Sequence, residues 1–578
     1  MFARTAAANF LLNFYDFEVW KRFWCVTIIN PVTGEETIIE NDAAQLINHY
    51  KAHKHEIYVG FNNRQYDDWI FKGIIKGFDP WDINEWIIKK QRKGWEFSSL
   101  LLKVKLNTFD TMIGFNGLKT LEAFMGVNIK ETDIPFDYDG EFTEAMIAGA
   151  LFYNKQDVLN TIRVFMERKS EFDSYMGLLK LFNLPLSYLS RSKAQLAAVI
   201  LGAKKHKWKD EFDISIPPTL KLTKYTQVID YFKNDWDYDT NLEIELAGVP
   251  HTLGTGGIHG AIPKYFGVGN YLHIDATSYY PTLMIVYAQW CMSRSGASVE
   301  KFKEIYDSRV EFKKQKDPKA NALKIVLNSA YGAMKDKFNA LYDPRSANNV
   351  CVFGQLLLVD LIERLELETD SELIQSNTDG LVFKVNGDEE KVIKVCEEWE
   401  KRTGIKIGFD KIIKICQKDV NNYIVVFGNG KVEAKGAYVK DLNNLDYDLA
   451  IVNQAIRKNL LENIPVEETI LNCDDFRMFQ KVVKLSNKYQ WVEHERLNAI
   501  NTKHDNKAYR VFASTNPDDG RLLKCKLTEK GVKKDKFGNT PDKCFVFNDD
   551  LTGVKIPKIL DKQYYINLAK KRLEDFGI

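Results

Sequence analysis

The most informative stretch of this chain is Lys324-Ile325-Val326-Leu327-Asn328-Ser329-Ala330-Tyr331-Gly332. Lys324, Asn328 and Tyr331 are spaced i, i+4 and i+7, which places them on one face of a helix. The apolar residues Leu323, Val326, Leu327 and Ala330 fall on the opposite face and can pack inward. We expect a helix that shows solvent a cation, an amide and a phenol and that stops near Gly332. Such a face suits a charged, flat ligand, because Lys holds phosphate, Tyr stacks on a base and Gly permits close backbone approach. An ordinary helix with a polar outer face is the alternative.

The flanking sequence predicts a helical hairpin and a sheet. Residues 299–316 and 318–335 have the pattern of two helices joined at Asp317-Pro318, and a third helix is expected over Leu356–Leu367. Tyr271–Ile274 is a predicted strand that leads into Asp275. The short apolar runs Leu373–Gln375 and Leu381–Val385 flank Asn377-Thr378-Asp379-Gly380, so this tetrapeptide is predicted to form a hairpin turn.

Two carboxylates therefore stand at the ends of predicted strands. Asp275 and Asp379, delivered by neighbouring strands, can hold two Mg²⁺ ions about 3.5–4 Å apart. Taken singly, each aspartate is more simply a turn-capping residue. Their combination with the helix favours chemistry at a phosphate group, because paired metals neutralise the charge that develops there.

Three motifs in order carry a family resemblance. Asp275-Ala276-Thr277-Ser278-Tyr279-Tyr280-Pro281, Lys324 to Gly332, and Asn377-Thr378-Asp379 resemble the DxxSLYP, KxxxNSxYG and DTD motifs of family B DNA polymerases. The resemblance implies that Asp275 and Asp379 are catalytic metal ligands, with the Ala276 carbonyl as a third. It implies that Tyr280 is the steric gate against a ribose 2′-hydroxyl, that Lys324 binds the triphosphate, and that Asn328 and Tyr331 border the nascent base pair. Arg309 and Lys313, spaced i, i+4 on the facing helix, suit further phosphate contacts, or else belong to a solvated helix face.

The third motif departs from the family pattern. The family's first Asp is Asn377 here, and Gly380 replaces the usual Ser. An Asn carbonyl oxygen can bind a metal or water but adds no charge. Because the second Asp is the direct ligand in the family, Asp379 should suffice; an impaired polymerase site is the alternative.

The first 170 residues alternate between predicted strands and helices. Strands are expected over Phe10–Phe17, Phe23–Ile29 and Ile57–Phe61, and helices over residues 42–53, Asp67–Lys76 and 143–169. Asp16-Phe17-Glu18 closes the first strand, Asn62 to Asp67 follows the third, and Tyr153 and Asp157 are spaced i, i+4 on the last helix.

These three short patterns, DxE, NxxxYD and YxxxD, resemble the motifs of DnaQ-like 3′→5′ proofreading exonucleases. The resemblance implies that the carboxylates of Asp16, Glu18, Asp67 and Asp157 hold two Mg²⁺ ions, that Tyr153 orients the attacking water, and that Asn62 contacts DNA. Each pattern alone is weak, and its residues can equally be structural.

Further DNA contacts are predicted around the polymerase motifs. Gly256 and Gly257, in a Gly-rich loop, could bring backbone amides to template phosphates, although an ordinary turn is the alternative. Tyr423, Lys435 and Tyr438 resemble the family's KxY and KG elements, which hold the primer strand, and Lys418 is a substitute for the missing Lys. The basic tract 521–536 suits phosphate tracking by a thumb, or forms a solvated loop.

The resemblance predicts a multidomain α/β and α+β fold, with an RNase H-like exonuclease domain and a right-hand polymerase. The predicted domains are the exonuclease (1–170), a connecting region with N-terminal palm elements (171–250), palm (251–297), fingers (298–345), palm (346–445) and thumb or C-terminal region (446–578). Lys324 follows Asp275 by 49 residues and Asp379 follows Asn328 by 51. These gaps lack room for the insertions of the family's protein-primed phage replicases, so we expect an ordinary nucleic-acid primer and helper proteins.

Composition sets the remaining expectations. The 578 residues carry 80 basic and 79 acidic side chains, so any nucleic-acid footprint is local. The eight scattered cysteines argue against structural zinc and disulfides and fit a reducing compartment. No signal peptide or apolar span is evident, which predicts a monomeric protein in the host cytoplasm without membrane association.

The predicted partners are primed DNA, dNTPs and replication helpers such as single-strand binding protein, helicase and primase, with two Mg²⁺, or Mn²⁺, per active site. The small size and minimal fingers favour a bacteriophage or mobile element. The alternatives are an exonuclease with an impaired polymerase site and a non-catalytic DNA-binding replisome component.

Overall fold

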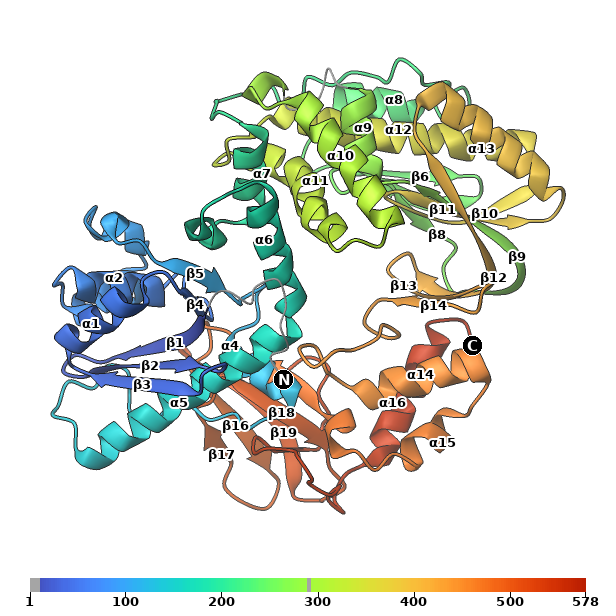
Figure 1. The fold of residues 1–578 in the computed structure, drawn as a ribbon. Helices are drawn as coiled ribbons and strands as arrows, with labels where there is room; N and C mark the ends of the chain where they lie inside the picture. The colour runs from blue at the N-terminus through green and yellow to red at the C-terminus, as the bar shows by residue number, and fades with distance from the viewer. Residues whose placement is uncertain (1–10, 288–292) are drawn as a thin grey trace. The chain divides into compact units, whose positions relative to one another are not determined.

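The computed structural model describes residues 11–287 and 293–578, and the chain forms two compact units (Figure 1). Unit 1 contains Met1–Arg191, Leu442–Val452 and Glu467–Asn567, and unit 2 contains Ser192–Asp441, Asn453–Val466 and Leu568–Ile578. Both combine helices and sheets, which confirms the mixed α/β, multidomain part of the fold prediction. No helix within the described ranges is long and apolar enough to cross a membrane. Phe10, Cys291 and the N-terminal residues that bear on a signal peptide lie outside these ranges.

The N-terminal part of unit 1 is built on a five-stranded sheet of order β3-β2-β1-β4-β5. Its strands are β1 (Leu12–Val19), β2 (Trp24–Asn30), β3 (Glu35–Glu40), β4 (Ile57–Gly60) and β5 (Asn107–Asp110). Strand β1 pairs antiparallel with β2 and parallel with β4, and β4 pairs parallel with β5. Strand β1 is buried along almost its whole length, so a polar residue on it stands in a low-dielectric interior.

The helices around this sheet are α1 (Ala43–His53), α2 (Asp67–Ile75), α3 (Pro80–Asn84), α4 (Leu118–Met125), α5 (Glu144–Glu167) and α6 (Lys169–Leu181). Helices α1, α2 and α5 lie where the sequence predicts them, whereas α3, α4 and α6 were not predicted. Helix α5 begins after Thr143, whose hydroxyl accepts a hydrogen bond from the Met146 amide at 3.3 Å. Helix α5 packs on β1 and β2, and so brings its own polar side chains up to those of β1.

Two further sheets in unit 1 come from the C-terminal part of the chain. The first has the order β15 (Lys481–Lys484), β18 (Ala508–Ala513), β21 (Cys544–Val546), and the second β17 (Thr502–His504), β16 (Trp491–Arg496), β19 (Asp519–Thr528), β20 (Gly531–Lys536). Helix α4 packs on β15 and β18 through Ala123, Val482 and Ala508. Residues 467–567, grouped above with a thumb, therefore fold together with the N-terminal segment.

Unit 2 is built on a nine-stranded antiparallel sheet. Its order is β14 (Val432–Lys435), β13 (Asn422–Phe427), β12 (Ile407–Asp419), β9 (Tyr265–Ala276), β11 (Gly380–Val385), β10 (Ser371–Asn377), β8 (His259–Ala261), β7 (Val249–Leu253), β6 (Leu242–Leu246). The predicted strand before Asp275 and the predicted hairpin are confirmed: Asn377 pairs with Gly380, and Thr378-Asp379 forms the turn. Strands β9 and β11 pair with each other, so Asp275 and Asp379 lie at the same end of these two central strands.

The helices of unit 2 include the predicted hairpin. They are α7 (Lys193–Leu201), α8 (Gln227–Asp230), α9 (Tyr279–Val286), α10 (Val299–Lys314), α11 (Lys319–Lys335), α12 (Pro344–Glu368) and α13 (Glu389–Thr403). In the C-terminal part, α14 (Ala450–Glu462) and α16 (Lys562–Glu574) contain residues of both units, and α15 (Val466–Leu471) belongs almost entirely to unit 1. Helices α10 and α11 pack on each other and on α7. Helix α12 starts twelve residues earlier than predicted, because Asp343 caps it through the Ser346 amide (3.2 Å).

Helix α11 ends at Lys335, as the predicted helix over 318–335 does, and passes through Gly332. Ala333 and Met334 are fully buried, and their packing outweighs the cost of a helical glycine, about 1 kcal/mol. One local alternative is wrong. The basic tract 521–536 is not a loop but the two paired strands β19 and β20. The buried Leu523 and Cys525 alternate with the half-buried Lys524 and Lys526, which suits a half-buried hairpin better than a solvated segment.

Candidate active sites

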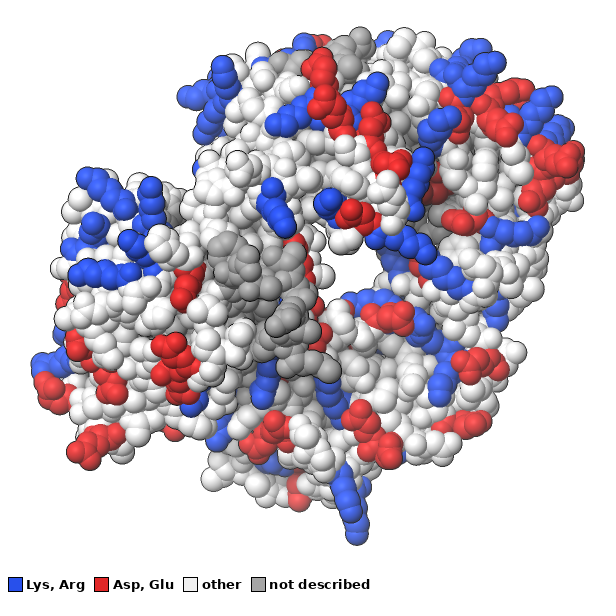
Figure 2. Space-filling view, viewed as in Figure 1, with Lys and Arg blue, Asp and Glu red and all other residues white. Residues whose placement is uncertain are grey.

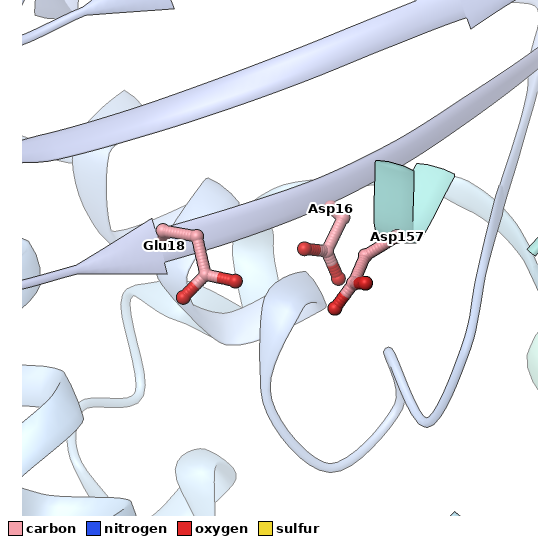
Figure 3. A group of neighbouring side chains, drawn as sticks. All are labelled: Asp16, Glu18 and Asp157. Carbon is pink, nitrogen blue, oxygen red and sulfur yellow. The ribbon is translucent and has the colours of Figure 1, made fainter. Parts of the chain in front are cut away.

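Three carboxylates meet at the centre of the N-terminal sheet. Asp16 and Glu18 are two residues apart on β1 and therefore share one face of the strand, and Asp157 comes from α5. One oxygen from each lies within 4.8 Å of the others, and Figure 3 shows the three side chains projecting into one space. The sequence prediction that these residues meet is confirmed for this trio.

The fourth predicted carboxylate, Asp67, lies nearby but outside the trio. It begins α2 and accepts a hydrogen bond from the Phe17 amide at 3.0 Å. Asp67 lines a cavity of about 1060 Å³ together with Asn62 and all three members of the trio. Burial raises the pKa of Asp67 to about 7. The structure thus brings all four carboxylates to one cavity, with three in direct proximity.

The buried carboxylates of this cluster repel one another, so a positive charge would stabilise their ionised forms. Burial raises the pKa of Asp16, and the neighbouring charges of Asp67 and Glu18 raise it further. Burial also raises the pKa of Glu18, and the charge of Asp157 raises it further. Oxygen-rich clusters of this kind are the ligand sets that Mg²⁺ and Mn²⁺ prefer, so the residues present fit a divalent metal.

This cluster also contains a lysine, Lys119, that was not predicted from the sequence. Lys119 of α4 places its ammonium 2.5 Å from Asp157 Oδ1 and 3.3 Å from Glu122 Oε1, and 4.5 Å from the ring centre of Tyr153. Burial lowers the pKa of Lys119, but the two carboxylates outweigh burial and the net pKa is raised. Glu122 is fully buried, and burial raises its pKa to about 7. The only local signal was a Lys and a Glu at i, i+3, which is common on any helix.

Tyr153 lies where the pattern YxxxD predicts, one helical turn before Asp157. Its side chain is buried, and Lys119, which pairs with Asp157, lies 4.5 Å from its ring centre. Burial, followed by the charge of Asp157, raises the pKa of Tyr153. The phenol therefore stays protonated and can donate or accept a hydrogen bond at the edge of the carboxylate cluster.

A second carboxylate pair lies in unit 2, where β9 meets the β10–β11 turn. Asp275 pairs with Gly380 across β9 and β11, and the Ala276 amide donates to the Asp379 carbonyl at 2.8 Å. Burial raises the pKa of Asp275 and the charge of Asp379 raises it further, whereas His273 and Lys313 oppose the shift. Two carboxylates that repel each other beside the Ala276 carbonyl are a donor set that fits divalent metal.

The departure at Gly380 has a steric reason. A Cβ at this position would lie 3.0 Å from His273 Nε2 and 3.7 Å from Asp275 Oδ1. His273 thus fills the space that a side chain at position 380 would need. His273 was not singled out from the sequence, because a lone His on a strand carries no specific signal.

Two tyrosines face each other beside this pair. Tyr280, at the start of α9, stacks on Tyr331 of α11 with ring centres 4.5 Å apart and planes 8° apart. Gly257, at φ +108°, lies against them, since a Cβ there would come within 3.5 Å of the Tyr280 hydroxyl. The positive φ requires glycine at this point of the loop. Gly256 is exposed next to it.

The predicted cations divide into those near the carboxylates and those on the open face of α11. Lys313 contributes to the electrostatics of Asp275, and Arg309 donates to Ser278 Oγ at 3.2 Å. Lys324 and Asn328 are exposed on the α11 face that also carries Tyr331, as predicted. The helical hairpin therefore presents charged and polar groups around the stacked rings.

The predicted primer-strand residues lie at the β13–β14 edge of the same sheet. Lys435 pairs with Tyr423 in register. Burial raises the pKa of Asp379, and the charge of Lys435 acts against that rise. Tyr438 lies against two cations, with Lys418 Nζ 4.8 Å and Arg572 Cζ 4.5 Å from its ring centre. Arg572 was missed because it is distant in sequence.

No protein-family model and no curated protein matches the chain. Among solved structures, the chain is similar to the family B DNA polymerase from the hyperthermophilic archaeon Pyrobaculum calidifontis. The two share 13% identity at a TM-score of 0.42, over 98% of this chain and 78% of the archaeal one.

Proposed function

We propose that this chain is a template-directed DNA polymerase of the family B kind with a 3′→5′ exonuclease. The observation that carries the proposal is the convergence in unit 2 of Asp275 and Asp379 with the stacked Tyr280–Tyr331 pair beside them. A metal-binding carboxylate pair beside aromatic rings and basic helices matches the needs of a nucleoside triphosphate, which offers phosphates and a flat base.

In synthesis, the primer 3′-hydroxyl attacks the α-phosphorus of a dNTP, a phosphodiester bond forms and pyrophosphate leaves. Lys324, Arg309 and Lys313 would bind the triphosphate. Tyr280 would exclude a 2′-hydroxyl, and Tyr331 and Asn328 would border the new base pair. The ring contact between Tyr280 and Tyr331 would place the sugar contact next to the base contact.

In proofreading, water attacks the terminal phosphodiester and a deoxynucleoside monophosphate leaves. Asp16, Glu18, Asp157 and Asp67 would form the metal-binding wall of the cavity, and Tyr153 would orient the water. Asn62, on the same cavity wall, would contact the DNA end. Lys119 would hold Asp157 in place through its ion pair.

Divalent metal bound at each centre, Mg²⁺ or Mn²⁺ and two ions per site, would activate the attacking oxygen and neutralise the charge that develops on phosphorus. We further propose that Gly256, Gly257, Tyr423, Lys435 and Tyr438 contact template or primer. The proposed setting is replication of phage or mobile-element DNA in a host cytoplasm, by a monomer assisted by helper proteins.

Single substitutions separate the two activities. On a 5′-labelled primer annealed to a longer template, Asp275→Ala should abolish extension and keep degradation, and Asp16→Ala should do the reverse. One gel with and without dNTPs reads both. Loss of both activities in either variant, or no effect of Mg²⁺ and dNTPs on wild type, would contradict the proposal. Degradation without any extension by wild type would favour the impaired-polymerase alternative, which Asn377 motivates.

A further inference from the structure

The motifs leave one charged segment of unit 1 without a role. Ile88-Lys89-Lys90-Gln91-Arg92-Lys93 are six consecutive exposed residues, and four of them are cations. We call residues 85–96, which contain them, the basic loop. Figure 2 shows Lys and Arg side chains gathered on the part of unit 1 where Figure 1 draws α1 and α2.

The basic loop is held in shape by its own backbone. It opens with one π-helical turn, Glu85–Lys89, and the Lys90 amide donates to the Glu85 carbonyl at 2.9 Å. The Trp86 indole closes it by donating to the Lys93 carbonyl at 3.1 Å. Turns of this rare type are frequent at functional sites. The cations therefore project from an ordered support.

Aromatic rings alternate with these cations. Lys90 and Arg92 lie 5.6 and 6.0 Å from the ring centre of Trp86, and Lys93 lies 5.9 Å from that of Trp95. Trp95 is 45% exposed although it is a large apolar side chain. Gly94 is buried against Trp69, since a Cβ there would lie 2.2 Å from that ring. The loop thus packs on the unit through Trp69 and leaves Trp95 open to solvent.

The charge of the basic loop is mostly uncompensated. Among the salt bridges of the described residues, one involves the loop, between Lys89 and Glu85 at 3.2 Å. Glu96 accepts a hydrogen bond from the Lys93 amide and is the only other acid in the loop. Four cations against two carboxylates, with an open indole among them, offer electrostatic and stacking contacts together.

The basic loop is continuous with the nuclease cavity. Glu85, Ile88 and Lys89 line the same 1060 Å³ cavity as Asp16 and Asp157. The loop therefore starts at the cavity wall and runs outward to Trp95. A chain of phosphates and bases whose end lies in the cavity would pass over these residues.

We propose that the basic loop binds single-stranded DNA and guides its 3′ end into the exonuclease cavity, an inference that rests on the nuclease proposed for that cavity. A single strand fits better than a duplex, because only unpaired bases expose the faces that Trp95 can stack on. The phosphates supply the anions for Lys90, Arg92 and Lys93, which take part in none of the salt bridges of the described residues, and a further contact for Lys89 beside Glu85.

The test removes the charge and the ring separately from the full chain. The first variant carries Lys89→Gln, Lys90→Gln, Arg92→Gln and Lys93→Gln, and the second Trp95→Ala. The matched control loses the same charge at exposed lysines elsewhere, through Lys391→Gln, Lys394→Gln, Lys555→Gln and Lys558→Gln. Fluorescence anisotropy with a labelled 20-nucleotide strand in EDTA, at rising salt, measures binding without hydrolysis. Exonuclease KM in Mg²⁺ is measured on the same strand and on a trinucleotide.

The four-site variant should bind the strand more weakly, with a salt slope smaller by about 2–3, because each phosphate contact on a single strand contributes about 0.7. Trp95→Ala should weaken binding about tenfold. Both should raise KM for the 20-mer but not for the trinucleotide, and the control should match wild type. Unchanged binding and KM in the four-site variant, or equal losses in the control, overturn the inference. If wild type does not hydrolyse DNA yet the four-site variant alone binds poorly, the loop inference stands and the proposed nuclease falls.

Discussion

At the scale of single residues, Lys119 sets the charge balance of the carboxylate cluster in unit 1. Its ammonium lies between Asp157 and Glu122, and all three side chains are almost fully buried. A buried charge that loses its partner is costly, whereas an exposed ion pair contributes little. The importance of Lys119 follows from burial and could not be read from its type.

We expect Lys119→Met to lower the free energy of unfolding of unit 1 by about 3 kcal/mol, because two buried carboxylates lose their cation. Urea unfolding measures the loss. Lys155→Met is the matched control, since Lys155 pairs with Glu36 at 2.7 Å on the surface, and it should cost less than about 1 kcal/mol. Equal losses in both variants would count against this reasoning. Adding Glu122→Gln to Lys119→Met should restore part of the stability.

A second residue-scale prediction concerns sugar selection. Tyr280→Ala should reduce the preference for dNTP over rNTP, measured as the ratio of kcat/KM values, by at least about tenfold, because the ring that blocks the 2′-hydroxyl is removed. Tyr279→Phe is the control. The Tyr279 hydroxyl donates a hydrogen bond to the buried Gly354 carbonyl at 2.7 Å. The Tyr279→Phe variant should therefore lose some stability and keep sugar selection. An unchanged ratio in Tyr280→Ala would remove the steric-gate role.

At the scale of elements, α12 organises unit 2 through buried acids. Glu363 is 2% exposed and accepts hydrogen bonds from the amides of Thr223, Lys224 and Tyr225 at 2.7–3.0 Å. Burial alone would raise the pKa of Glu363, but these hydrogen bonds outweigh it and the pKa is lowered. One carboxylate thus fixes a segment that has no regular structure.

This arrangement gives a pH prediction. Because the folded pKa of Glu363 lies below its unfolded value of 4.5, its contribution is complete above that value and is lost as pH falls through the folded pKa. Glu363→Gln should lower stability at pH 7 by about 2–3 kcal/mol, and the difference from wild type should shrink below pH 4. Denaturant titrations at pH 7 and pH 3.5 provide the comparison. A difference that stayed constant with pH would show that the charge contributes nothing.

Elements whose signals are local were predictable from the sequence, and those that depend on distant segments were not. The α10–α11 hairpin and the turn at Thr378-Asp379 follow from helical spacing and turn chemistry within a few residues. The packing of α4 on β15 and β18 joins segments more than 350 residues apart, and no local pattern encodes such a contact. The acidic motifs of both sites were found for the same reason, and Arg572 was missed because it is distant in sequence. Lys119 and His273 were missed because a lysine on a helix and a lone histidine on a strand carry no specific signal.

At the scale of the whole molecule, the segment between Asp275 and Asp379 contains little beyond its helices. Helix α10 connects directly to α11 through residues 315–318, and α12 fills most of the distance from α11 to β10. We therefore expect extension of an annealed oligonucleotide primer, without addition of a first nucleotide to a hydroxyl-bearing protein. Incubation of labelled dNTP with template and such a protein in the absence of oligonucleotide checks this. Labelled protein in that reaction would refute the expectation.

The interleaving of the two units has a consequence for the order of events during synthesis on the ribosome. The five-stranded sheet of unit 1 is complete once β5 has emerged, but the residues that cover α4, such as Ala508 and Arg510, follow much later. At a synthesis rate of about 5–20 residues per second, roughly 20–75 s pass between the synthesis of α4 and that of the strands that cover its apolar side. During that interval the nascent chain exposes Ala123 and Ile129, so its yield in cells should depend on chaperones that shield this surface until the last strands arrive.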